Sequence, residues 1–131
     1  WGIARDLATS SSFRPTGLAL QMLNSAVGGA FYPVSASGPG AGGLNAAAFL
    51  RKGNWAVAIT SGNASPITLS ITLSAAGAPP TQAFELSAAT PTTTNELANN
   101  VTIARAAITA PLRVTIPAYG FVILLPAAGR I

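Results

Sequence analysis

Apolar and hydroxyl side chains alternate without a fault from residue 66 to residue 74, where the chain reads Pro-Ile-Thr-Leu-Ser-Ile-Thr-Leu-Ser. A period of two places every second side chain on the same face of a β-strand. The segment therefore predicts a strand with one apolar and one hydroxyl face. Comparable patterns occur in the ranges 44–51, 54–61, 84–86, 101–103, 112–116 and 119–125. The last of these is apolar on both faces, which is typical of a strand covered on both sides.

Turn-forming residues separate these segments. Lys52-Gly53 lies between two of them and predicts a two-residue hairpin. Gly62-Asn63, Gly77–Pro80, Pro91 and Pro117-Ala118 divide most of the others. About seven or eight short strands with turns at such intervals are typical of an antiparallel β-sandwich. We therefore predict an all-β fold, with a sandwich in residues 30–131 and one N-terminal α-helix in a lead segment, residues 1–29.

Only residues 15–27 have a helical pattern. Pro15 suits the first turn, where its missing N–H is not needed, and Gly28-Gly29 predict the end of the helix. On a helical wheel the small and polar residues share one wedge of about 80°; they are Gly17, Gln21, Asn24, Ser25 and Gly28. Because the remaining circumference is apolar, we expect the helix to pack between two bodies. The expected interdomain packing residues are Leu18, Leu20, Met22, Leu23 and Val27.

The chain contains neither histidine nor cysteine. This excludes Cys/His zinc sites, thiol nucleophiles, disulfides and catalytic triads with an imidazole base. Glycoside cleavage needs two facing carboxylates, whereas the three acidic residues, Asp6, Glu85 and Glu96, are not spaced as a pair. Glu85 alternates with apolar neighbours and is expected to face water. We therefore expect no catalytic residue, no metal ion and no cofactor in this chain.

The seven basic residues give a net charge of +4, but only Arg51 and Lys52 are adjacent. Nucleic-acid binding uses clustered cations, so we expect no nucleic-acid partner. The longest strongly apolar run, Phe121–Leu125, is far shorter than the ~20 residues of a spanning helix, and no membrane partner is expected either. The charged fraction is only 8%, and this low charge fits an extracellular, secreted protein.

A glycine-rich stretch, Gly38–Gly43, contains a formal G-x-G-x-x-G pattern. Nucleotide binding would require a helix after the last glycine and an acidic residue about 20 positions later. The next segment has a strand pattern instead, and no acidic residue occurs between Asp6 and Glu85. We interpret the stretch as a loop.

Aromatic side chains are candidates for stacking on sugar rings. Trp55 shares a strand face with Val57 and Ile59, which favours core packing. The remaining candidate carbohydrate contacts are Trp1, Tyr32 and Tyr119.

Asn63-Ala64-Ser65 and Asn100-Val101-Thr102 fit the glycosylation sequon. Asn63 and Asn100 would be modified only in a eukaryotic secretory host. Both are expected in exposed turns.

Four segments together suggest a family: Phe13–Asn24, Leu50–Asn63, Thr94–Glu96 with Val101–Ile103, and Ile116–Val122. They resemble, in that order, the last barrel helix, a hairpin, a late loop and the closing strands of clan-A retaining glycoside hydrolases, with family 79 the nearest. In those enzymes the helix leads into a C-terminal β-sandwich. The resemblance implies that the catalytic acid pair lies in a barrel outside this chain, and that residues 1–29 are the end of that barrel domain. Trp1 would correspond to a residue at the end of the last barrel strand.

The resemblance makes the chain a non-catalytic accessory sandwich of a secreted glycoside hydrolase. Its expected partners are the catalytic barrel and a polysaccharide. Two alternatives stay open, a stand-alone carbohydrate-binding or adhesive module and a subunit of an extracellular fibre.

Overall fold

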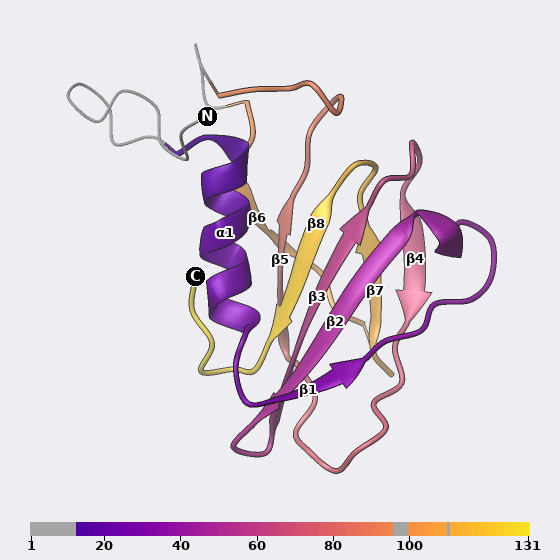
Figure 1. Ribbon diagram of the computed structural model, residues 1–131, viewed down its shortest axis with the longest axis vertical. Helices are drawn as coiled ribbons and strands as arrows, with labels where there is room; N and C mark the ends of the chain where they lie inside the picture. The colour runs from indigo at the N-terminus through magenta and orange to yellow at the C-terminus, as the bar shows by residue number, and fades with distance from the viewer. Residues whose placement is uncertain (1–12, 96–99, 110) are drawn as a thin grey trace.

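A computed structural model describes residues 13–95, 100–109 and 111–131 of the chain. Three layers are visible in Figure 1: the helix α1 (Pro15–Ala26), a six-stranded sheet, and a two-stranded sheet on the far side. The large sheet has the order β1 (Ala30–Pro33), β2 (Leu44–Arg51), β3 (Asn54–Ser61), β8 (Phe121–Leu125), β5 (Gln82–Leu86), β6 (Ile103–Ala106). The small sheet pairs β4 (Ile67–Ser70) with β7 (Arg113–Ile116).

Every pair of neighbouring strands in both sheets is antiparallel. The predicted fold, an antiparallel β-sandwich of about seven or eight strands with one N-terminal helix, is therefore confirmed. The helix adds a third layer that packs directly on the large sheet.

The large sheet has a hydrophobic core on each face. Met22 and Ala26 of α1 pack on the first face with Ala56, Ala58 and other residues of the sheet. Alternate residues of β3 point to the opposite face, where they meet the small sheet; these are Trp55, Val57 and Ile59. Trp55 is only 1% exposed, so its prediction as a core residue is confirmed.

β8 lies between β3 and β5 and is buried along its whole length. Val122 and Leu124 belong to the core between the sheets, whereas Phe121, Ile123 and Leu125 belong to the core under α1. This double burial confirms the prediction from its continuous apolar run.

The helix begins at Pro15, as predicted, and ends at Ala26, one residue earlier than expected. Gly28 and Gly29 follow with φ values of 148° and 78°. At Gly29 a side chain would collide with the backbone carbonyl of Leu50 in β2, so the chain leaves the helix where only glycine fits.

Only some residues of the predicted polar wedge of the helix are exposed to solvent. Gln21 and Asn24 are exposed as expected, and Ser25 donates a hydrogen bond to the carbonyl of Gln21 at 3.2 Å. Gly17 is buried, which corrects its place in the wedge. Its lack of a side chain let it count as neutral in the pattern.

Lys52 and Gly53 have φ values of 49° and 74°. Two consecutive positive φ values define the two-residue hairpin that the sequence predicts between β2 and β3. The glycine-rich loop is also confirmed: it contains a short 3-10 helix, Ala41–Gly43, and leads into β2 rather than into an α-helix.

Several strands differ from their predicted bounds, β4 and β6 by the most residues. The alternation of residues 66–74 continues as expected, with Ile71 and Leu73 half-buried, but pairing with β7 ends at Ser70. The predicted strand 101–103 begins two residues later, at Ile103.

Asn95 explains the later start of β6. Its Nδ2 donates to the carbonyls of Val101 and Phe13 at 2.8 and 3.2 Å, and its Oδ1 accepts from the Val101 amide at 2.8 Å. Asn95 therefore binds both backbone polar groups of Val101, which lies outside the strand ladder, while the Val101 side chain packs in the core under α1.

Candidate interdomain surface

An apolar groove of about 420 Å³ runs beside α1, between the helix and the large sheet. No charged side chain of the described residues lines it. The lining residues are Thr16, Ala19, Leu20, Leu23, Asn45, Ala46, Ala47, Ala58, Thr60 and Phe121.

The groove exists because α1 covers only part of the sheet. The helix contacts β8 most, then β3 and β5, so the outer strands β1 and β2 extend beyond it (Figure 1). Phe31 and Phe49 face each other on β1 and β2, with ring centroids 6.0 Å apart. They share the face of Ala47, and Phe31 is 61% exposed. The groove and this aromatic pair therefore form one apolar face, which we call the helix-side surface.

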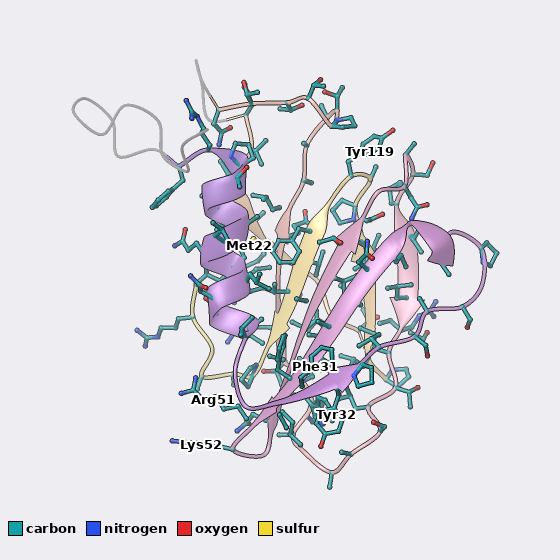
Figure 2. The ribbon with its side chains drawn as sticks, viewed as in Figure 1. Met22, Phe31, Tyr32, Arg51, Lys52 and Tyr119 are labelled. Carbon is teal, nitrogen blue, oxygen red and sulfur yellow. The ribbon has the colours of Figure 1, made fainter. Side chains whose placement is uncertain are left out.

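The five residues expected to pack between domains divide into three groups. Leu20 and Val27 are exposed, by 43% and 47%. Leu18 and Leu23 are half-buried against the core under α1. Met22 has no exposed surface and lies between α1 and the sheet (Figure 2), so it is a core residue of this domain and has no surface for a second body.

The candidate carbohydrate contacts are not brought together. Tyr32 and Tyr119 lie at opposite ends of the sheet (Figure 2). Tyr32 packs edge-on against Trp55 at 4.8 Å between centroids, and Tyr119 is half-buried in the turn before β8. Trp1 lies outside the described residues.

Glu85 is the one acidic residue among the described residues. Glu85 is half-buried, not fully exposed as expected, and lines a shallow hollow with Arg105 and Thr115. Asp6 and Glu96 lie outside the described residues. No group of His, Cys, Asp and Glu residues in the described part of the chain could hold a metal ion, and none of its helices has the length and hydropathy of a membrane span.

The two sequon asparagines have different environments. Asn100 is exposed and donates to the carbonyl of Thr94 at 2.9 Å. Asn63 is half-buried, which corrects its expected exposure: its Nδ2 donates to the carbonyl of Gly40 at 3.0 Å and to the Ser61 hydroxyl at 3.2 Å. The same nitrogen would carry a glycan, so the structure gives Asn63 the role of joining the glycine-rich loop to the end of β3.

Replacing Asn63 with alanine should therefore lower the free energy of unfolding by about 1–2 kcal/mol, because two hydrogen bonds are lost and Ser61 is buried. Asn100→Ala is the matched control and should cost about 0.5 kcal/mol or less. Urea denaturation followed by far-UV circular dichroism measures both. Equal stability of the two variants would contradict the role assigned to Asn63.

These features define the described chain as an antiparallel β-sandwich with a packed helix and one large apolar face. No protein-family model, curated protein or solved structure matches the chain.

Proposed function

We propose that this chain is the non-catalytic accessory β-sandwich of a secreted glycoside hydrolase, and that its helix-side surface packs against the catalytic barrel. The observation that carries the proposal is the uncharged groove beside α1, on the same face of the large sheet as the exposed Phe31. The resemblance of the helix and hairpin segments to clan-A glycoside hydrolases supplies the class of partner.

The composition of the surface supports an interface between domains. Large apolar patches on a protein surface commonly mark interaction sites, and the apolar lining of this groove suits another apolar face. Leu20 and Phe31 contribute the largest exposed side chains at its two sides. The hydrophobic effect would favour covering both.

Catalysis would then belong to the barrel. Among the described residues the chain has one acidic side chain, Glu85, whereas a retaining glycosidase uses two carboxylates about 5 Å apart. The sandwich would stabilise the barrel and orient it rather than react with the sugar.

A stand-alone carbohydrate-binding module is less well supported. Tyr32 and Tyr119 lie too far apart to form one platform, and Trp55 is buried. A binding module of that type needs several aromatic rings on one exposed face.

Deleting the lead and helix would not test this proposal. Met22 and Ala26 belong to the core of the sandwich itself, so residues 30–131 alone would expose a core face whether or not a barrel exists. The test must use the intact chain.

Hydroxyl-radical footprinting can compare the 131-residue chain with the polypeptide encoded by its complete reading frame. Leu20 and Phe31 should be oxidised several-fold more slowly in the longer polypeptide, because a barrel would cover them. Tyr119, at the far end of the sheet, is the internal control and should react equally in both. The longer polypeptide should also hydrolyse at least one member of a panel of aryl glycosides, while the 131-residue chain hydrolyses none.

Either of two kinds of result, from footprinting or from the reading frame and its activity, would overturn the proposal. One is equal oxidation of Leu20 and Phe31 in both polypeptides. The other is a reading frame without a barrel, or a barrel without glycosidase activity.

A further inference from the structure

The small sheet has an open edge. β4 pairs with β7 on one side only, and directly beyond that ladder the amide of Ile71 donates to the carbonyl of Leu112 at 2.9 Å. Backbone groups alternate in direction along an antiparallel strand, so those of every second residue point away from β7. The outward backbone groups belong to Thr68, Ser70 and Thr72. No hydrogen bond joins them to another described residue.

A cleft of about 400 Å³ lies along this open edge. Residues 68–73 line it, and so does the loop segment 34–37. The floor is the inner face of β2 and β3. Leu44 and Ala46 are half-buried there, whereas Ala48, Val57 and Ile59 are buried in the core between the sheets. The described lining contains no charged side chain.

The chemistry of the cleft matches an added β-strand. Unpaired amides and carbonyls at every second residue of segment 68–73 are the partners that an extended backbone needs. The apolar floor suits alternate side chains that point inward, and the half-buried Leu44 and Ala46 remain accessible to branched ones. The other alternate side chains would point outward, where β4 itself carries exposed hydroxyls.

We propose that this cleft binds an extended, uncharged peptide segment of a partner protein, which pairs with β4 as a third strand of the small sheet. A second copy of the chain would have to bring the edge of a whole sandwich between β4 and segment 34–37, whereas a peptide brings a single strand. The proposal does not depend on the proposed function, since the helix-side surface lies on the other face of the large sheet.

The probe is a synthetic peptide, acetyl-Ser-Ile-Thr-Val-Ser-Leu-Thr-Lys-Lys-amide, whose two lysines lie beyond the pairing segment and keep it soluble. Its matched control has proline at the central valine, which removes one backbone donor and disfavours a strand. Amide hydrogen exchange of the 131-residue chain, followed by NMR, reports binding directly. At saturating peptide the exchange of Ser70 and Thr72 amides should slow by about tenfold or more, since both would become hydrogen-bonded, and the proline peptide should have no effect.

A pair of protein variants tests the same edge independently. Ser70→Pro removes an outward N–H without touching the pairing with β7, and should weaken peptide binding by about tenfold. Thr115→Pro places the same change on β7, at the opposite edge of the small sheet, and should bind the peptide normally. Far-UV circular dichroism shows whether each variant is folded, and the exchange experiment on the unmodified chain stands if one is not.

Unchanged exchange at Ser70 and Thr72, or equal binding of the proline peptide, would overturn the proposal. So would protection of the same amides at high protein concentration without peptide, because a second copy would then occupy the cleft.

Discussion

Trp55→Ala should lower the free energy of unfolding by about 3–5 kcal/mol, one of the largest losses available to a single substitution in this domain. The side chain is buried between the two sheets, where its ring contacts Tyr32 and its Nε1 donates to the carbonyl of Ala75 at 3.2 Å. Alanine would leave a cavity and an unpaired carbonyl. Urea denaturation followed by far-UV circular dichroism measures the loss without depending on tryptophan fluorescence.

Trp55→Phe is the matched control. It keeps an aromatic ring and loses the N–H and part of the volume, so its expected cost is about 1–2 kcal/mol. A Trp55→Ala variant as stable as the original chain would contradict the core role. Because this variant disturbs the fold, any loss of glycan binding in it would not identify Trp55 as a sugar contact.

Met22→Ala and Leu20→Ala should separate the two sides of α1. Met22 has no exposed surface and packs with Ala56 and Ile123, so its truncation should cost about 2–5 kcal/mol. Leu20 is 43% exposed beside the groove, so its truncation in the isolated chain should cost about 1 kcal/mol or less.

Thermal and urea unfolding of the two variants under identical conditions measures this difference. The two residues lie two positions apart on one helix, so helix propensity cannot explain a large gap. A greater loss for Leu20→Ala would mean that the helix packs through its other side.

Much of the fold is predictable from the sequence because its strands have short-range signals. The alternation in residues 66–74 and the continuous run of β8 report which faces are buried. Lys52 and Gly53 fix the hairpin between β2 and β3 through their own backbone preferences. These signals depend on neighbours in the sequence.

The helix shows a limit of predictions from short-range signals. An apolar circumference indicates that a helix is covered, but not by which body. The sheet of the same chain covers Met22 and Ala26, and Leu20 remains available to a partner. Distinguishing these cases needs the position of the helix on the sheet, which depends on all the strands together.

The asparagines show the same limit. Asn95 binds the carbonyl of Phe13, far away in the sequence, and Asn63 binds that of Gly40. Each side chain donates a hydrogen bond to a backbone carbonyl of a segment that is distant in the sequence. A turn-forming residue type is all that the sequence shows at either position.

The place of β8 also governs when the domain can fold. It is the last of the eight strands to be synthesised, yet it joins β3 to β5 in the middle of the large sheet. Before β8 emerges from the ribosome, β1–β3 and β5–β6 are separate ribbons, because the strand that pairs with both β3 and β5 is missing. The large sheet can therefore close only after β8 has been synthesised, and until then the nascent chain exposes apolar surface and strand edges that favour aggregation.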